Sequence, residues 1–403
     1  MSSVQKLEDM PRPTGPRLLS QFRLRDVSFR NRVVLSPMQV YQATPDGLAD
    51  DWHLQHLGKF AVGGFGCVVT EGLIVDPVGR ATWGDLGIWS DDQIAPLRRI
   101  TDFVRGAGAV PAAQLHHAGP KAARQRPWEG FGPLTEVEAA RGEPAWVPVS
   151  SSADRSAPGW HMTREMTLDD IQAVTAAYGA AARRADAAGF DVIDIHAAHG
   201  YLLHSFLSPV ANRRTDGYGG DIDGRMRLLL EIAETLRANW PEGKAIFFRI
   251  SCVDWRADIE EPFDGWTIED SCRLTRELHR RGVDLIDCSS GGIRGATSMS
   301  GAADRRTGLK RGFQVPYAAA IRRETGVPTM AVGVILDGEQ AEGILEREEA
   351  DLIAIGRAAL FDPHWVLHAA RDLGADADWS LWPPSYGWWL AARERIGIAP
   401  ERA

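Results

Sequence analysis

The chain has 403 residues, of which 45 are Lys or Arg and 54 are Asp or Glu, so its formal charge is −9. This mildly acidic balance excludes nucleic acid as a main partner, because phosphate binding needs clustered Lys and Arg. A hydrophobic share of 44% excludes general disorder and leaves room for one large α/β barrel or two ordinary domains. Trp is unusually frequent, since its 14 copies outnumber Phe (13) and Tyr (6).

Cysteine usage and the first residues predict a cytoplasmic protein. The four cysteines form no CxxC pair, so we expect buried thiols in a reducing compartment rather than a disulfide framework. The N-terminal sequence has no apolar signal-peptide core, and no apolar run reaches the roughly 18–20 residues of a membrane span. We therefore expect no membrane partner, and we interpret residues 1–17, with three prolines, as a flexible leader.

Short apolar segments recur along the chain and predict buried parallel strands. Each has four to ten residues and is apolar nearly throughout, as expected for strands covered on both faces. In chain order the eight segments are residues 33–38, 66–75, 110–118, 190–199, 245–252, 283–290, 328–335 and 351–356.

Amphipathic segments lie between most of these strands. The clearest is residues 169–188, where Thr-Leu-Asp-Asp caps an Ala-rich helix that Gly189 ends. The others are residues 93–105, 223–240, 268–281, 316–325, 339–346 and 364–372. Eight alternations predict a (β/α)8 barrel over residues 18–377. A doubly wound sheet is the alternative, but it usually carries a Gly-rich turn, and no GxGxxG occurs here.

Two segments are not needed for a barrel. Residues 119–167, after the third strand, are rich in Pro, Trp and Gly. Long loops in compact domains are usually functional or disordered, and this one leaves the carboxyl end of a strand, where barrel active sites lie. We therefore expect a cap over the site. The second segment is the tail, residues 378–403, which carries four Trp and is expected to pack on the rim or on a second subunit.

His196, His199 and Tyr201 follow the fourth strand and form the most informative cluster. Two imidazoles three residues apart can donate to one oxyanion where the chain turns, and Tyr201 can deliver a proton. A metal site is the alternative, with His116 and His117 as further ligands. Structural histidines are a third interpretation.

The ends of strands five, seven and eight add two further candidates. Gly333 and Gly356-Arg357 follow strands seven and eight, where barrels commonly hold a phosphate on backbone N–H groups and an arginine. Arg249 sits within an apolar strand, so it must face a ligand or form an ion pair inside the barrel.

Taken together, these placements resemble the old yellow enzyme family of flavin-dependent ene-reductases. The similarity covers residues 17–391 and is closest to the thermophilic-like branch that includes the xenobiotic reductases. It is carried by Ser36-Pro37-Met38, Asp51-Trp52-His53, Gln114 with His117-Ala118-Gly119, the segment 196–220, the segment 287–292, Ala331-Val332-Gly333 and Ile355-Gly356-Arg357.

The resemblance implies a noncovalent FMN at the barrel mouth, reduced by NADPH or NADH. An α,β-unsaturated carbonyl would then bind with its oxygen on His196 and His199, take hydride at the β-carbon and take a proton from Tyr201 at the α-carbon. Tyr41 resembles the family's substrate-contacting tyrosine. The residues implied for FMN are Ser36, Pro37, Met38, Gln39, Gly72, Gln114 and Arg249 at the ring, and Ala331, Gly333, Gly356 and Arg357 at the phosphate.

The chain departs from this pattern at two positions. The residue after Ser-Pro-Met is typically a cysteine in this branch, and here it is Gln39, whose amide cannot ionise as a thiol does. The family's His-Ala-Gly-Arg-Lys has Pro120 in place of its arginine. The first departure bears on the expected flavin potential and substrate preference, and the second bears on the expected contacts of that loop.

Four functions are therefore compatible with the sequence. The first is reduction of activated alkenes, and the second is desaturation of a specialised substrate by the same cofactor, motivated by Gln39 and Pro120. The third is a metal-dependent hydrolase or lyase, and the last is a ligand-binding barrel without catalysis.

Seven of the 14 Trp fall in the cap or the tail: Trp128, Trp146, Trp160, Trp379, Trp382, Trp388 and Trp389. In the branch that the chain resembles, the C-terminal segment reaches the neighbouring subunit's site, and Trp389 aligns with a substrate-facing aromatic there. The resemblance thus implies a homodimer or homotetramer with a partly intersubunit lid. Rim packing within one subunit is the alternative.

Overall fold

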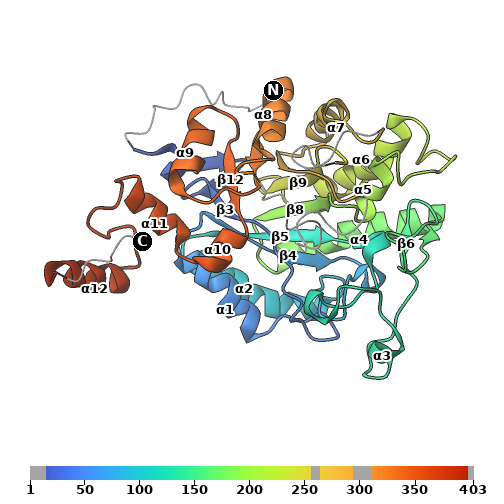
Figure 1. Ribbon diagram of the computed structural model, residues 1–403, viewed down its shortest axis with the longest axis horizontal. Helices are drawn as coiled ribbons and strands as arrows, with labels where there is room; N and C mark the ends of the chain where they lie inside the picture. The colour runs from blue at the N-terminus through green and yellow to red at the C-terminus, as the bar shows by residue number, and fades with distance from the viewer. Residues whose placement is uncertain (1–14, 256–263, 294–309, 398–403) are drawn as a thin grey trace.

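A closed barrel forms the centre of the molecule. The computed structural model describes residues 15–255, 264–293 and 310–397. Eight parallel strands close in the order β10-β11-β12-β3-β4-β5-β8-β9 (Figure 1). Each lies within one expected apolar segment: β3 (Val33–Leu35), β4 (Cys67–Ile74), β5 (Val110–His116), β8 (Val192–Ala197), β9 (Ala245–Ser251), β10 (Leu285–Ser289), β11 (Thr329–Ala331) and β12 (Leu352–Ile355). The (β/α)8 prediction is confirmed, and the doubly wound alternative is wrong.

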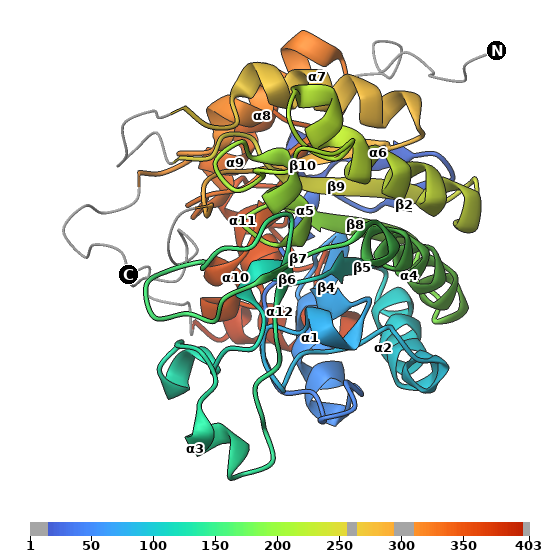
Figure 2. The ribbon, with the colours of Figure 1, turned by 90° about the vertical axis from the view of Figure 1, so that its right-hand side faces the viewer.

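Helices cover the outside of the barrel (Figure 2). The seven expected helices are present as α2 (Ile94–Gly106), α4 (Leu168–Ala187), α6 (Ile222–Asn239), α7 (Ile268–Arg280), α8 (Val315–Thr325), α9 (Gly338–Glu346) and α11 (Trp365–Asp372). The expected cap of α4 forms, because the Thr167 hydroxyl accepts from Asp170 N at 3.1 Å and the Asp170 carboxylate accepts from Thr167 N at 2.7 Å.

Five helices in the described residues were not expected: α1 (Asp51–Val62), α3 (Glu136–Ala139), α5 (Leu202–Leu207), α10 (Arg357–Phe361) and α12 (Pro384–Arg395). In α1 the buried face mixes His53 and His56 with Leu57 and Phe60, so polar residues interrupt the apolar period. Two of the others, α5 and α10, have only six and five residues, too few for a period to show.

Two separate hydrophobic cores surround the barrel strands. Alternate strand residues pack outward against the helices, as Val33 and Leu35 do, or inward along the axis, as Val34 does. A hairpin of β1 (Phe22–Leu24) and β2 (Val27–Phe29) contributes Phe22 and Phe29 to the inner core. Side chains therefore fill the barrel interior at the amino-terminal ends of the strands. The carboxyl ends of the strands remain available for a site.

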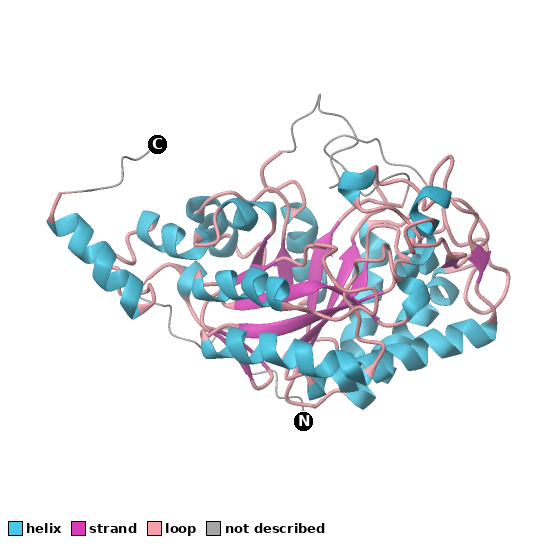
Figure 3. Cartoon of the chain, turned by 90° about the horizontal axis from the view of Figure 1, so that it is seen from below, coloured by secondary structure: helices cyan, strands magenta, loops and turns pink. Residues whose placement is uncertain are grey.

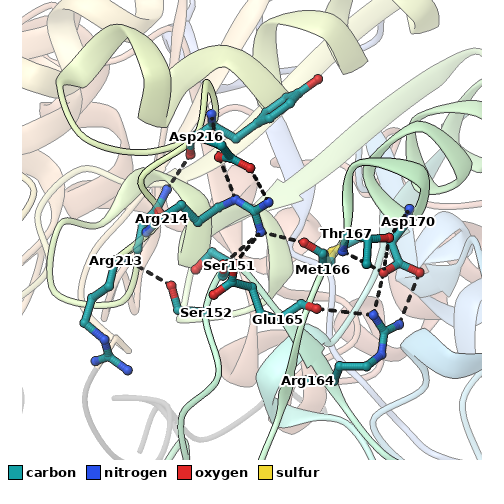
Figure 4. Close-up of polar contacts among 12 residues, drawn as sticks. Ser151, Ser152, Arg164, Glu165, Met166, Thr167, Asp170, Arg213, Arg214 and Asp216 are labelled. Atoms are coloured by element: carbon teal, nitrogen blue, oxygen red, sulfur yellow. Dashed lines mark hydrogen bonds and ion pairs between the residues drawn. The ribbon is translucent and has the colours of Figure 1, made fainter.

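Residues 119–167 contain little regular structure: η5 (Gly119–Lys121), η6 (Pro127–Glu129), α3 (Glu136–Ala139) and the short pair β6 (Val149–Ser150) with β7 (Arg164–Glu165). Figure 4 shows how the end of this segment is fastened to the barrel. The buried Arg214 donates to the carbonyl oxygens of Ser151 (3.2 Å) and Met166 (2.6 Å) while its other nitrogens bind the Asp216 carboxylate.

The tail divides into a packed part and an exposed part. Trp379 and Trp382 are buried against Leu367, and Trp382 stacks on His364 with 5.1 Å between the ring centroids. Beyond them α12 projects from the body of the molecule (Figures 1 and 3), and Trp388 and Trp389 are 60% and 68% exposed.

Residues 1–14 of the expected leader lie outside the described residues. The chain is held in place at Arg17 and Leu18, because their N–H groups each donate to the Glu342 carboxylate at 2.7 Å. In the described part of the chain no helix combines the length and apolarity needed to cross a bilayer. All four cysteines are buried and none is in a disulfide.

Candidate active site

The polar side chains at the barrel mouth follow from residue alternation along the strands. In β9, Phe247 belongs to the inner core while Ile246 and Phe248 belong to the outer one, so Arg249 points inward above Phe247. The same alternation points six further side chains into the barrel. They are Gln114 and His116 of β5, Asp194 and His196 of β8, and Asp287 and Ser289 of β10. Because all the strands are parallel, these residues meet at one end of the barrel.

A cavity of 1190 Å³ opens at this mouth. Ligand pockets commonly measure about 300–1,000 Å³, so there is room for a cofactor together with a substrate. Thirteen of the residues expected at the site line it: Ser36, Pro37, Met38, Gln39, Tyr41, Gln114, His196, His199, Tyr201, Arg249, Gly333, Gly356 and Arg357.

Three expected residues do not line the cavity. Gly72 lies behind it, where a Cβ would come within 2.9 Å of the His116 Cβ, so the glycine allows that histidine to approach. Ala331 faces the outer core, and its neighbour Val332 faces the cavity instead. Trp389 lies on the exposed tail helix α12, so within one chain it is not a site residue.

His196 and His199 are held with ring nitrogens facing each other, since His199 Nδ1 lies 3.3 Å from His196 Nε2. The Ala198 N–H donates to His196 Nδ1, which leaves the imidazole proton on Nε2. Ser289 Oγ accepts from Gln314 at 2.9 Å and lies 2.6 Å from His199 Nε2, so its own proton is available to that nitrogen. When Ser289 donates to Nε2, His199 carries its proton on Nδ1, and a bound oxygen atom that accepts from both rings would replace the 3.3 Å contact between them.

Burial keeps these histidines neutral. It lowers the pKa of His116, His196 and His199 well below the ordinary value. Neighbouring imidazoles add to the effect, as do Arg124 for His116 and Arg249 for the other two. The site therefore offers neutral N–H donors rather than imidazolium ions at pH 7.

Tyr201 stands beside the imidazoles. Its ring contacts His116 and His196 edge-on, with centroid distances of 4.4 and 4.9 Å. Its hydroxyl oxygen and that of Tyr41 both lie near one guanidinium, Arg124 of the cap, at 3.4 and 3.1 Å. The expected proton donor and the expected substrate contact are thus joined through a residue that the sequence analysis did not select.

A buried charged layer lies one step deeper in the barrel. Arg249 Nε is 3.4 Å from the Asp287 carboxylate and Arg249 Nη1 donates to Ser36 Oγ at 3.2 Å. Burial and Asp287 raise the pKa of Asp194 to about 7, and that carboxyl accepts from the Gln114 amide at 2.8 Å. Arg249 is therefore both an ion-pair partner inside the barrel and a cavity residue, so its two expected roles coincide.

The far end of the cavity is formed by glycines. Gly333 adopts φ 111°, and a Cβ there would meet Gln314 Oε1 at 2.6 Å. A Cβ on Gly356 would enter the space next to Met38 and Ser36, 3.7 Å from each. Exposed backbone N–H groups beside glycines, with Arg357 nearby, suit a phosphate.

Gln39 provides a test of whether FMN fits. Its amide oxygen accepts from Gly72 N, and its Nε2 is buried with no hydrogen-bond partner among the described residues. A buried unpaired amide donor is costly, and the isoalloxazine ring of FMN presents acceptor atoms along its edge. Together with the glycine-lined end and Arg249, this donor fits FMN at the mouth.

The metal alternative is not supported by the geometry. Within the described residues, no group of three His, Cys, Asp or Glu side chains is arranged to hold a metal ion. His117 Nδ1 accepts from the Gly119 N–H, and the nitrogens of His199 contact His196 and Ser289.

The sequence analysis missed the cap side of the cavity, which is lined by Arg124, Pro127, Gly130 and Phe131. The signal for Arg124 was weak, because a single arginine among several in a loop has no period to mark it as buried. It also missed Lys121 as a structural support. This lysine is buried and donates to the carbonyl oxygens of His199 (2.7 Å) and Gly292 (2.6 Å).

Fold and site together define a class, the barrel oxidoreductases with a flavin at the carboxyl ends of the strands. Comparison with known proteins identifies the family within this class. The chain belongs to the NADH:flavin oxidoreductase / NADH oxidase family, whose model matches residues 17–376. An NADPH dehydrogenase of Geobacillus thermodenitrificans is 39% identical over 358 residues, which cover 89% of this chain and 94% of that protein.

Solved structures give the same fold. The old yellow enzyme homologue from Zymomonas mobilis matches with a TM-score of 0.70 and 24% identity over 93% of this chain and 98% of that one. Morphinone reductase in complex with tetrahydroNAD matches with a TM-score of 0.68 and 24% identity, over 90% and 92% of the two chains. As a member of the NADH:flavin oxidoreductase / NADH oxidase family, this protein binds FMN and takes electrons from NAD(P)H, and it shares its fold with the old yellow enzyme homologue.

Proposed function

We propose that this enzyme reduces the C=C bond of α,β-unsaturated carbonyl compounds, with NADPH or NADH as electron donor. One observation carries the proposal. His196 Nε2 and His199 Nδ1 lie 3.3 Å apart in a cavity that Tyr201 also lines. An oxygen atom bound beside this pair can accept from both rings when each nitrogen carries its proton, and a carbonyl oxygen is such an acceptor.

The residues then have distinct roles. The cavity residues named above would hold FMN, which would supply the hydride delivered by the nicotinamide. The two imidazoles hold the carbonyl oxygen and stabilise the negative charge that grows on it in the transition state. Tyr201 gives its proton to the α-carbon as the β-carbon receives the hydride. Arg249, at the mouth next to Ser36, places positive charge where a reduced anionic flavin would be stabilised.

The reaction is tested with the FMN-loaded protein under anaerobic conditions. We expect NADPH or NADH to bleach the flavin absorbance and 2-cyclohexenone to restore it, with cyclohexanone as the product. Cyclohexanone in place of the enone is the matched control and should leave the flavin reduced. Reduced flavin that reoxidises with oxygen but with no enone of a varied panel contradicts the proposal.

Desaturation of a specialised substrate is the second candidate, and Gln39 is the observation that favours it. An amide at this position tunes the flavin by hydrogen bonding only, because it cannot ionise as a thiol does. If neither nicotinamide bleaches the bound flavin while a saturated carbonyl compound does, desaturation replaces C=C reduction as the proposed function.

We also propose that the enzyme acts on small molecules in the cytoplasm as a homodimer or homotetramer. The exposed side chains of the tail support a second copy: Leu381, Tyr386, Trp388, Trp389 and Ile396 are all 48% exposed or more. Truncation after Asp378 should change both the mass in solution and the KM for the enone. Unchanged mass and kinetics would leave rim packing as the role of the tail.

A further inference from the structure

The cap carries a buried cation that the proposed reaction has not yet used. Arg124 is only 2% exposed and is among the largest fully buried side chains in the described residues. Its Nη2 lies 3.1 Å from the Tyr41 hydroxyl oxygen and 3.4 Å from that of Tyr201. All three side chains line the cavity.

The backbone holds Arg124 in this position at a cost. Ala123, directly before it, adopts φ 58°, and Tyr41 adopts φ 56°. These left-handed conformations are strained for non-glycine residues and persist where the surroundings enforce them. Arg124 N also donates to Ala81 O at 2.8 Å, and the guanidinium lies over the Phe131 ring, 4.6 Å from its centroid. The side chain is therefore clamped on several sides.

The chemistry of a guanidinium fixes the direction of the two hydrogen bonds. Arginine has five N–H donors and no acceptor, so both tyrosine oxygens must accept from it. Each hydroxyl proton is then turned away from Arg124, and the cavity is the space that both hydroxyls share. Tyr41 and Tyr201 are thereby prepared as donors to whatever binds there.

Arg124 also remains charged. Burial lowers its pKa, but Tyr41, Tyr201 and Asp85 outweigh burial and raise the pKa above the ordinary value. The Asp85 carboxylate accepts from the N–H groups of Ala81 and Thr82 and from the Thr82 hydroxyl. A fixed positive charge thus lies next to the phenol that loses a proton.

We propose that Arg124 is the positioning residue for proton transfer, which orients the Tyr201 hydroxyl toward the substrate and stabilises the phenolate formed there. This inference rests on the proposed function. The alkene gains a hydride at the β-carbon from the reduced cofactor and the Tyr201 proton at the α-carbon, and water then restores the proton to the phenolate. Arg124 itself exchanges no proton.

The kinetic test uses Arg124→Met, with Arg126→Met as the matched control. Arg126 lies in the same loop but pairs with Glu143 and Glu129 and contacts neither tyrosine. We expect Arg124→Met to slow flavin reoxidation by 2-cyclohexenone about 100-fold and reduction by NADPH less than twofold. In the Tyr201→Phe background the same change should cost less than threefold, because the two residues act as one unit.

Two further measurements distinguish an effect of the Arg124 charge from an effect on the structure of the cap. In D₂O the solvent isotope effect on reoxidation should rise in Arg124→Met, since proton transfer becomes slower relative to hydride transfer. In Arg124→Ala, added guanidinium ion should restore part of the rate, whereas urea, which is neutral and of similar shape, should not.

A third readout does not depend on turnover. Labelling the six tyrosines with ¹³C at Cζ, with Tyr41→Phe and Tyr201→Phe for assignment, reports the hydrogen bond to each phenol oxygen. Arg124→Met should shift the Tyr41 and Tyr201 signals and leave the other four unchanged. Equal reoxidation rates in Arg124→Met and Arg126→Met, or unmoved Tyr signals, overturn the inference. An FMN-loaded enzyme that NADPH reduces but no enone reoxidises contradicts the proposed function instead.

Discussion

The two walls of the cavity are built by different rules. One wall consists of residues at strand ends, such as His196 and Arg249, whose directions follow from the alternation of side chains along β8 and β9. The other consists of cap residues, such as Arg124 and Phe131, which depend on left-handed backbone at Ala123 (φ 58°) and Phe131 (φ 61°). A strand-end residue is positioned by the whole barrel, while a cap residue is positioned by local turns and a few anchors. Substitutions on the strand-end wall should therefore alter the reaction, whereas substitutions in the cap should alter local stability.

The strand-end wall should give the largest effect on chemistry. Tyr201→Phe removes the proton donor and keeps the ring that packs on His116 and His196. We expect reoxidation of the flavin by 2-cyclohexenone to fall about 1,000-fold, while reduction by NADPH changes less than threefold. Stopped-flow absorbance separates the two half-reactions. An equal loss in both would mean that Tyr201 shapes the cavity and does not donate a proton.

The cap wall should respond through stability. Arg214→Met removes the donors to the carbonyl oxygens of Ser151 and Met166, and we expect the cap to open locally at a cost of about 3 kcal/mol. Limited proteolysis should then cut within residues 136–163 well before the barrel. Arg213→Met is the matched control, because that side chain is 53% exposed and pairs with Asp154 at the surface. Equal cleavage of both variants would show that Arg214 does not hold the cap.

The same contrast explains what the sequence could predict. Parallel strands have a period of two and a fixed register, so an apolar run with a polar end indicates both the strand and the direction of its last side chains. For Ala331 the expectation came from the family resemblance and not from this alternation. The resemblance implied Ala331 at the phosphate, yet its side chain lies in the outward phase, and Val332 one residue later lines the cavity.

The cap could not be predicted in this way. Arg124 has no periodic neighbours, and its burial results from contacts with Ala81, Tyr41 and Phe131. Tyr41 lies 83 residues before Arg124, and Phe131 lies 7 residues after it. Gly119 and Pro120 are residue types that favour a turn, but a turn does not say which later side chain it brings inward. The family pattern pointed to position 120 for a basic residue, whereas the guanidinium in this loop comes from position 124.

The barrel wall also contains a carboxyl group that can be tested by pH. Burial raises the pKa of Glu71 to about 8, against an ordinary value of 4.5, although the Val40 N–H donates to it. The folded state thus holds a proton that the unfolded chain releases, so this contribution is complete below pH 4.5 and is lost as the pH rises through 8. Glu71→Gln should remove that decline.

Urea unfolding between pH 5 and 8.5 measures this effect. The stability of wild type relative to Glu71→Gln should fall by on the order of 2 kcal/mol across the range. The FMN concentration is held constant and saturating, so that cofactor binding adds equally to both proteins. Parallel pH curves for the two proteins would show that Glu71 titrates normally in the fold.

The smallest expected effect concerns proton placement on the strand-end wall. Ser289→Ala removes the hydroxyl that lies 2.6 Å from His199 Nε2 and that accepts from Gln314. Without it, His199 is free to carry its proton on Nε2, and one of the two donors to the substrate oxygen is lost.

We expect kcat for enone reduction to fall about 10-fold, with reduction by NADPH unchanged. Ser290→Ala is the neighbouring control, since Ser290 also accepts from Gln314, at 3.2 Å. ¹⁵N NMR of the imidazoles should show the His199 tautomer change in Ser289→Ala only, and a tautomer that stays on Nδ1 would mean that His196, rather than Ser289, sets the proton position.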